Sequence, residues 1–390
     1  MAKIDDSVKK KVPELRFKGF TDEWEERKFA DFIDVKSGKD YKHLNSGSIP
    51  VYGTGGYMLS VDRALSDIDA IGIGRKGTID KPYLLKAPFW TVDTLFYAVP
   101  KQNIDLQFSL SIFKKINWKK FDESTGVPSL SKTVINSVSV SVPSYEEQQK
   151  IGSFFKQLDD TIALHQRKLD LLKEQKKGFL QKMFPKNGAK VPELRFAGFA
   201  DDWEERKLKD VTERVRSNDG RMDLPTLTMS ASSGWLDQKD RFSGDISGKE
   251  KKNYTLLKKG ELSYNHGNSK LAKYGVVFSL TNYEEALVPR VYHSFKALEN
   301  TSADFIEYMF STKLPDRELG KLISSGARMD GLLNINYDDF MNIHISIPNY
   351  EEQILMSAFF RKLDENIALH QRKLDLLKEQ KKGFLQKMFV

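Results

Sequence analysis

Apolar residues recur every three or four positions along two long stretches of the chain, beginning at Ile151 and at Met356. This spacing is typical of a coiled coil, because it keeps one apolar stripe facing a partner helix. The apolar seam positions are Ile151, Phe155, Leu158, Ile162, Leu169, Leu172 and Phe179 in the first stretch, and Met356, Phe360, Leu363, Ile367, Leu374, Leu377 and Phe384 in the second.

The start of each helix is marked in the sequence. Pro143 and Pro348 each precede a Tyr-Glu-Glu-Gln segment, and a proline is tolerated at this point because no helical donor is needed there. Glu146 and Glu147 suit the positive end of the helix dipole. The first helix is therefore predicted over about 146–184.

An amphipathic helix needs a partner, and the second copy in the same chain has the highest effective concentration. We expect the two helices to pack antiparallel, because a globular block enters each one from its N-terminal side and parallel packing would crowd the blocks together. His165 and His370 fall on the seam. We predict that they are interface residues, each with one ring nitrogen hydrogen-bonded.

The polar residues are repeated as well. The segment VPELRFKGFTDEWEERKF at 12–29 recurs with four changes at 191–208, and residues 162–184 recur unchanged at 367–389. By eye, the intervening blocks at about 30–129 and 209–334 share no similarity. Exact identity over these 23 residues exceeds what packing requires. Either the duplication is recent or each copy meets the same partner.

Short alternating runs before the two helices, at 137–142 and 343–347, predict half-buried strands and hence mixed α/β blocks. The expected fold is α/β (α+β), with two globular blocks at opposite ends of an antiparallel two-helix coiled coil and approximate twofold symmetry. The predicted parts are a first block with its repeat segment (1–142), a first helix (143–188), a second block with its repeat segment (189–347) and a second helix (348–390).

Composition and charge limit which classes of binding partner and which compartment we expect for this chain. The net charge is +8, yet residues 30–142 carry only three more basic than acidic groups and residues 209–347 carry equal numbers, so charge alone does not indicate a nucleic-acid protein. The chain has no Cys and no apolar run long enough for a membrane span, and its first residues lack an export signal. We expect a cytoplasmic protein without a membrane partner.

In their order, these features resemble the specificity subunit of type I restriction-modification systems. The resemblance spans the whole chain and includes YGTGGY at 52–57, AIGIGRKGTIDKP at 70–82 and SLSKTVINSVSVSVPSYEEQ at 129–148. It implies that each block is a target-recognition domain reading one half of a split, asymmetric sequence in double-stranded DNA. It also implies that the helices set the spacing and dock two adenine methyltransferase subunits, which restriction subunits can join.

The same resemblance places the chemistry in the partners. The methyltransferases would use S-adenosylmethionine and the motor-nuclease subunits ATP and magnesium, so this chain is expected to bind no cofactor and to catalyse nothing. The sequence agrees, because it has no Asn/Asp-Pro-Pro-aromatic methyltransferase loop. The glycine-rich 72–78 segment lacks the lysine of a P-loop, and none of the six His pairs with another at metal-ligand spacing.

Base readout needs Arg or Lys for guanine and Asn or Gln for adenine, and glycine-rich loops allow close approach to phosphate. The candidates in the first block are His43, Tyr52, Gly55, Arg75, Lys76, Lys81 and Lys132. Those in the second block are Tyr264, Asn265, His266, Asn268, Lys270, Lys273, Arg290, Ser325 and Arg328. The second block lacks the glycine-rich loops of the first, and any single candidate could instead be an ordinary surface or turn residue.

Other functions remain open at this point. A stand-alone pseudo-dimeric DNA-binding regulator would also need two readers on a helical spacer, but no helix-turn-helix pattern is evident and two unlike readers do not suit a palindromic operator. A purely structural coiled-coil scaffold would leave two large, different blocks unexplained. Co-purification separates these hypotheses, because a specificity subunit should recover a methyltransferase and a regulator should purify alone.

Overall fold

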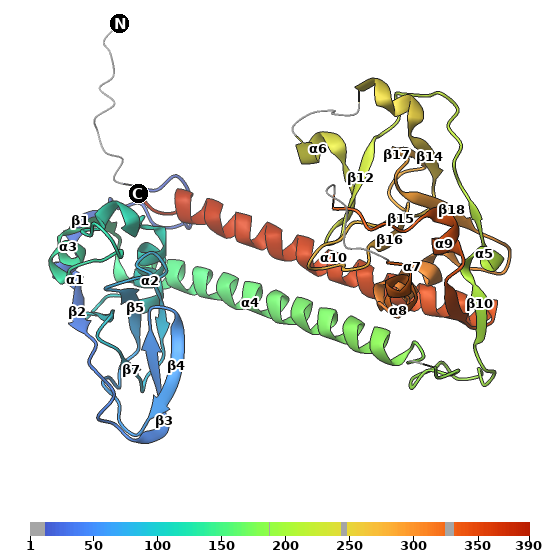
Figure 1. Cartoon of the computed structure of the whole chain (residues 1–390). Helices are drawn as coiled ribbons and strands as arrows, with labels where there is room; N and C mark the ends of the chain where they lie inside the picture. Colours follow the sequence, from blue (N-terminus) through green and yellow to red (C-terminus); the bar gives the residue numbers. More distant parts are fainter. Residues whose placement is uncertain (1–11, 187, 243–247, 324–330) are drawn as a thin grey trace, which may run out of the picture. The chain divides into compact units, whose positions relative to one another are not determined.

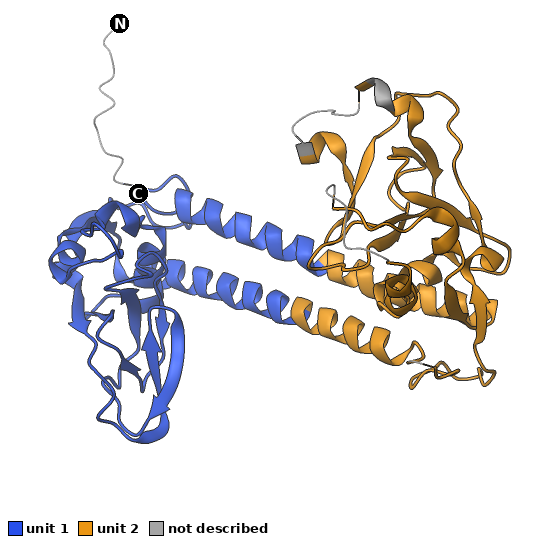
Figure 2. Ribbon diagram, in the orientation of Figure 1, with its two compact units in different colours: residues 1–168, 370–390 blue, residues 169–369 orange. Residues whose placement is uncertain are grey.

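The computed structural model describes residues 12–186, 188–242, 248–323 and 331–390. The chain forms two compact units, with unit 1 comprising Met1–Lys168 and His370–Val390, and unit 2 comprising Leu169–Leu369 (Figure 2). Each of the two long helices therefore contributes one part to each unit. Within the described ranges, no helix combines the length and apolarity needed to cross a membrane.

Unit 1 consists mostly of short strands that precede the first long helix (Figure 1). Its elements are β1 (Glu25–Lys28), α1 (Phe29–Phe32), β2 (Ile33–Ser37), β3 (Ser46–Gly53), β4 (Gly56–Val61), β5 (Ala70–Gly74), β6 (Tyr83–Leu85), β7 (Trp90–Thr91), β8 (Leu95–Pro100), α2 (Leu106–Lys115), the 3-10 helix η1 (Trp118–Phe121), α3 (Lys132–Ser137), β9 (Ser139–Val142) and the first part of α4 (Tyr145–Lys182).

Unit 2 has a similar succession of elements. They are β10 (Glu204–Lys207), α5 (Leu208–Val211), β11 (Thr212–Arg214), β12 (Leu227–Ser230), β13 (Gly234–Asp237), α6 (Gln238–Phe242), the 3-10 helix η2 (Gly248–Asn253), β14 (Thr255–Lys258), β15 (Leu262–Asn265), β16 (Val276–Ser279), β17 (Glu285–Val288), β18 (His293–Ala297), α7 (Ala303–Ser311), α8 (Asp316–Lys321), α9 (Tyr337–Met341), β19 (His344–Ile347) and the first part of α10 (Tyr350–Lys387).

The two units contain the same four-stranded sheet. Its strand order is β2-β8-β5-β6 in unit 1 and β11-β18-β15-β16 in unit 2, and all neighbouring strands in both sheets are antiparallel. The repeated Glu-Glu-Arg-Lys forms β1 and β10, which pair with the strands predicted before the helices, β9 and β19. Blocks without visible sequence similarity thus share one frame.

The units differ in their additional strands. In unit 1, β3 and β4 form a hairpin and β7 adds to β3 in parallel. Unit 2 instead has two antiparallel pairs, β12-β13 and β14-β17. The strands outside the shared sheet therefore differ between the two units.

Within each unit the long helices pack antiparallel, as predicted. In unit 1, the rings of Phe154 and Phe384 lie 5.0 Å apart at their centroids, and Asp159 pairs with Lys381. In unit 2, Phe179 and Phe359 are also 5.0 Å apart. Lys176 reaches Asp364 there at 2.5 Å, so the two units repeat one set of helix contacts.

The predicted seam faces the packed side of the helices. Eight of its residues are buried, namely Ile151, Phe155, Leu169, Leu172, Met356, Phe360, Leu374 and Leu377. The other six are partly buried, namely Leu158, Ile162, Phe179, Leu363, Ile367 and Phe384. His165 and His370 meet each other inside unit 1, with their Nδ1 atoms 3.1 Å apart. Because one ring must donate and the other accept, at least one imidazole in this contact is neutral.

The repeated Glu-Glu-Gln anchors each block to its helix. Glu147 accepts two hydrogen bonds from Arg16, at 2.8 and 2.7 Å, and Glu352 accepts the same pair from Arg195. Both carboxylates are about 1% exposed. The sequence suggested a helix-dipole role for Glu147, whereas the structure places this side chain in a buried ion pair.

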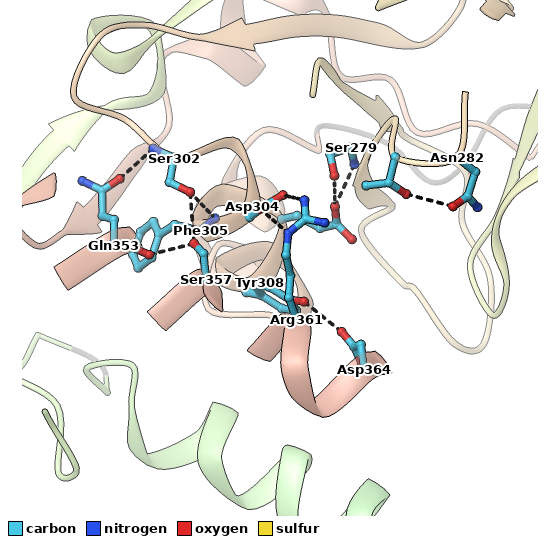
Figure 3. Close-up of polar contacts among 12 residues, drawn as sticks. Ser279, Asn282, Ser302, Asp304, Phe305, Tyr308, Gln353, Ser357, Arg361 and Asp364 are labelled. Atoms are coloured by element: carbon cyan, nitrogen blue, oxygen red, sulfur yellow. Dashed lines mark hydrogen bonds and ion pairs between the residues drawn. The ribbon is translucent and has the colours of Figure 1, made fainter. Parts of the chain in front are cut away.

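The glutamine that follows holds the start of a second helix. Gln353 accepts a hydrogen bond from the Ser302 backbone N–H, which lies at the N-cap of α7, at 3.0 Å (Figure 3). Gln148 accepts one at the same distance from Asp105, the N-cap of α2. In unit 2 the same junction includes the Arg361–Asp304 ion pair and a bond from the Tyr308 hydroxyl to Asp364 (Figure 3). These contacts join each block to the start of its long helix.

Candidate nucleic-acid interface

Three of the candidates in unit 1 line one depression of about 410 Å³, formed where β5 ends. Arg75 and Lys76 enter it from the β5–β6 loop, and Lys132 enters from the start of α3. Glu123 is the acidic residue in the lining, and its carboxylate accepts a hydrogen bond from the Ser131 backbone at 2.8 Å. The depression thus carries a surplus of positive charge.

The backbone fixes the positions of Arg75 and Lys76. The Arg75 N–H donates to Thr94 at 2.8 Å and its carbonyl accepts from Leu130 at 2.9 Å. Gly77 turns the chain at φ +91°, a conformation that favours glycine. The Arg75 guanidinium lies 5.9 Å from the Phe96 ring centroid, which holds the side chain on an apolar support.

Lys132 occupies the first turn of α3, where the helix dipole disfavours a positive charge. The positive charge of Lys132 is unfavourable for the helix, but it would be stabilised by an anionic ligand.

The other candidates in unit 1 do not line this depression. Tyr52 is half-buried between Tyr57 and Tyr83, and Gly55 lies in the open β3–β4 turn. The His43 ring is 5.9 Å from Trp90, away from the depression. Lys81 is exposed in the β5–β6 loop, so the structure brings together Arg75, Lys76 and Lys132 and leaves the rest separate.

In unit 2 the β15–β16 loop forms a comparable depression of about 430 Å³. Asn265, Asn268 and Lys270 line it, together with Arg241. Asn265 is held in place because its Oδ1 accepts the Gly267 N–H at 3.0 Å. Asn268 and Lys270 are exposed. The strands β5 and β15 occupy the same place in the shared sheet, so both depressions follow equivalent strands.

Two of the candidates in unit 2 belong to the core instead. Tyr264 is fully buried and stacks on Phe340 with centroids 4.3 Å apart. His266 is 4% exposed, and its two ring nitrogens contact the carbonyls of Leu333 and Val291 at 2.7 and 3.1 Å. Their expected role as DNA contacts is therefore wrong, because packing and internal hydrogen bonds occupy both side chains. Their polar neighbours in the sequence do not reveal this burial.

Arg290 belongs to a cluster that the sequence reading missed. The positive charges of Arg290 and Arg214 lower the pKa of Arg216, as like charges do. Arg214 stacks over Tyr337 at 4.0 Å. The alternation of Arg214 and Arg216 around buried Val215 places both on one exposed face. That alternation was the available signal.

Lys273 is exposed, with its ammonium 5.2 Å from the Tyr274 ring centroid. Ser325 and Arg328 lie outside the described residues.

Chemically, both units expose groups that are suited to binding an anionic partner. Exposed guanidinium, ammonium and amide groups beside glycine turns can contact phosphates and base edges. A cluster of like charges gains most from an anionic partner, because neutralising phosphates releases condensed counterions. In the part of the chain that the structure describes, no group of three or more acidic or imidazole side chains could hold a metal ion.

Comparisons with known proteins agree on one family. The model of the type I restriction modification DNA specificity domain matches this chain twice, at residues 21–174 and 200–379. The MjaVIII specificity subunit, a type I restriction enzyme subunit of Methanocaldococcus jannaschii, is 21% identical over 336 residues, covering 82% of this chain and 75% of that protein.

Solved structures match as well. The S subunit of a type I restriction-modification system from M. genitalium aligns with a TM-score of 0.68 and 12% identity, covering 97% of this chain and 99% of that chain. A structure concerned with complex assembly and conformational transition of the type I R-M system aligns with a TM-score of 0.47 and 13% identity, covering 94% and 97%. The M. genitalium likeness establishes the fold.

Proposed function

The chain belongs to the family of type I restriction-modification specificity subunits, and we propose from this premise that it reads a bipartite, asymmetric target in double-stranded DNA. Unit 1 would read one half of the target and unit 2 the other. Two unlike readers on a duplicated frame suit two unlike half-sites, whereas a palindrome would need two identical readers.

The observation that carries the proposal is the position of the two depressions. Both follow the equivalent strand of the same sheet, yet one presents Arg75 and Lys76 and the other presents Asn268 and Lys270. Arg and Lys match guanine edges and Asn matches adenine. A constant frame with exchanged side chains at one loop is what modular base readout requires.

We propose that the long helices dock two adenine methyltransferase subunits, through which restriction subunits can join. Exposed leucines at repeated positions support this docking, because an exposed apolar side chain is stabilised when a partner protein removes it from water. They are Leu164 and Leu171 on α4, and Leu369 and Leu376 on α10, each more than half exposed. The partners would supply S-adenosylmethionine, ATP and magnesium chemistry, and this chain would supply recognition in the cytoplasm.

Block exchange tests the proposal. Residues 30–129 are replaced by the corresponding block of a relative, and the complex with the methyltransferase is expressed in cells whose methylome is then sequenced. We expect one half of the methylated sequence to change and the other to persist. The matched exchange of residues 209–334 should change only the other half.

Two results would contradict the proposal. If either exchange altered both half-sites, readout would not be divided between the blocks. If the chain purified without a methyltransferase and alone bound DNA tightly and specifically, the stand-alone regulator would be the better explanation.

A further inference from the structure

The excess positive charge of the chain lies in the two identical helical segments. Residues 162–184 and 367–389 each contain six basic and two acidic residues, so the two copies together equal the net charge of +8. The rest of the chain contains equal numbers of basic and acidic residues. A surplus of one sign on these helices indicates an anionic partner that meets them.

In unit 2, lysines of this segment line a depression that also includes the turn after α7. Its volume is about 820 Å³, and its basic residues are Lys173, Lys176, Lys177, Lys182, Lys186 and Lys313. Asp364 is the acidic residue among the described residues of the lining, and it is already paired with Lys176 at 2.5 Å. The depression therefore carries a large surplus of positive charge.

Acidic residues outside the lining balance only part of this surplus. Lys186 pairs with Glu193. Lys177 lies 3.8 Å from Glu174, with both side chains largely exposed, and an exposed pair of this kind contributes little in water. Lys173 is exposed and forms no ion pair with any described residue. Lys173 and Lys177 are therefore available to an anionic partner.

Lys313 joins this depression to the candidate reading loop of the same unit. Its ammonium donates to the Leu271 carbonyl at 3.0 Å, and Leu271 lines the depression that contains Asn268 and Lys270. Lys313 follows the C-cap of α7 with φ +64°, in the left-handed region where glycine is usual. The chain thus places a cation between the two depressions although this backbone conformation is unfavourable for a lysine.

The lysines and the exposed leucines occupy different faces of α4. Lys173 follows Leu164 by nine residues, which is about two and a half turns of an α-helix, so the two side chains point in opposite directions. Lys177 is one turn further along and lies on the same face as Lys173. A methyltransferase docked on the leucines would leave the Lys173 face open to a second partner.

We propose that the lysine depression, defined by Lys173, Lys177 and Lys313, holds phosphates of duplex DNA beside the half-site that unit 2 reads. The proposal rests on the proposed function and adds a contact that is independent of sequence. Its continuity with the reading loop favours DNA over an acidic protein segment.

A phosphate contact also explains why these exposed positions are identical in the two copies. The equivalent residues Lys378 and Lys382 are exposed in unit 1. The phosphate backbone carries the same charge at every sequence, so identical lysines can serve two unlike readers. Of the two causes that the repeated helix left open, a common partner is the one supported, and that partner is the DNA backbone.

Salt-dependent DNA binding tests the proposal. The complex of the full chain with its methyltransferase is titrated onto the target found by methylome sequencing and onto duplexes of unrelated sequence. K173A/K177A should weaken binding to every duplex by about tenfold at physiological salt and reduce the salt slope by about two, because each lost phosphate contact removes about one. K378A/K382A should have the same effect.

The matched control removes the same amount of charge from the same unit. Lys259 and Lys362 are exposed in unit 2, lie outside the lining and pair with Glu284 and Glu365. K259A/K362A should therefore leave the affinity and the salt slope unchanged. Circular dichroism and thermal unfolding check that each variant is folded.

Lys313 allows binding to be separated from stability. Lys313→Gly removes the ammonium and supplies the residue that the backbone conformation favours, so the unfolding temperature should be unchanged or higher. DNA binding should nevertheless weaken several-fold, with a salt slope lower by about one. Lys313→Arg keeps the charge and should restore binding. A glycine variant that binds DNA as tightly as the unaltered chain would remove Lys313 from the interface.

Chemical footprinting gives a direct readout on the unaltered complex. DNA should protect Lys173, Lys177 and Lys313 from acetylation, as measured by mass spectrometry, and should leave Lys259 and Lys362 reactive. Protection of the first three by the methyltransferase in the absence of DNA would assign this face to a protein partner and would overturn the proposal.

The outcomes distinguish the two levels of inference. If the unaltered complex methylates a bipartite target and K173A/K177A matches its control in affinity and salt slope, the lysines do not contact DNA and the proposed function stands. If the unaltered complex prefers no target, the proposed function fails and this inference fails with it. A loss of binding confined to the target sequence would also overturn the phosphate contact, since the lysines would then support base readout.

Discussion

In unit 1 the strand β5 ends at Gly74 and turns directly into Arg75, whereas in unit 2 the equivalent strand β15 ends at Asn265 and continues into the buried His266. The two loops follow equivalent strands of the two four-stranded sheets, but they expose different side chains. Added strands also differ, with a β3–β4 hairpin in unit 1 and the pairs β12-β13 and β14-β17 in unit 2.

The buried polar contacts, in contrast, are the same in the two units. The arginine–glutamate pairs have the same lengths in both units, and the glutamines that follow hold equivalent helix starts. The comparison teaches that buried polar contacts preserve the frame while surface loops diverge.

The largest effect should come from breaking one of the constant ion pairs. Glu147→Ala leaves the largely buried guanidinium of Arg16 without its partner, which should lower the free energy of unfolding by about 3–5 kcal/mol. Hydrogen exchange should locate the loss in unit 1. Glu352→Ala should do the same in unit 2, and the exposed control Glu146→Ala should change little. Equal loosening of both units by one variant would refute the assignment of each pair to its own unit.

The next largest effect should come from low pH, which is expected to destabilise unit 2 through His293. Burial lowers the pKa of His293 in unit 2 to about 4, and its Nε2 donates to the Ile335 carbonyl at 2.9 Å. The unfolded histidine titrates near pH 6.5, so the unfolded state binds more protons below that value. Stability should therefore fall by roughly 3 kcal/mol as the pH drops from 6.5 to 4.

The check is a series of urea unfolding curves across this pH range, with unit 2 followed by hydrogen exchange. His293→Gln should reduce the acid-dependent loss in unit 2, because glutamine does not titrate. An identical pH slope in the variant would show that other groups cause the loss.

Arg75 should have an intermediate effect that is confined to one half-site. If it reads a base, Arg75→Ala should weaken DNA binding by about 1–3 kcal/mol and relax one target position. Binding measured against a library of substituted targets would reveal this. Lys86→Ala is the control, since Lys86 pairs with Asp69 outside the depression. Unchanged affinity and salt dependence would remove the β5–β6 loop from the interface.

The smallest effect is expected for Arg216, an exposed cation to which we assign a phosphate contact and not a base contact. Arg216→Ala should weaken binding several-fold on every sequence and reduce the salt slope by about one. Arg221→Ala provides the matched control in the same unit, because Asp219 and Glu285 already pair with Arg221. A loss confined to one target sequence would instead give Arg216 a reading role.

The sequence by itself determined the helices, their seam, the strands that precede them and the twofold repetition. Heptad spacing and period-two alternation are local signals, and repeated segments need no structure to be recognised. It also named Arg75, Lys76, Asn268 and Lys270, which the structure places in two loop depressions, and their contact with DNA stays a prediction.

Tertiary structure decided the rest. It gave two dissimilar blocks one strand order, buried Tyr264 and His266, and placed Arg214 over the ring of Tyr337. Each of these outcomes depends on segments far apart in the chain. Whether a polar side chain is buried, paired or exposed is set by such neighbours, because the free energy of a polar group follows its surroundings and not its residue type.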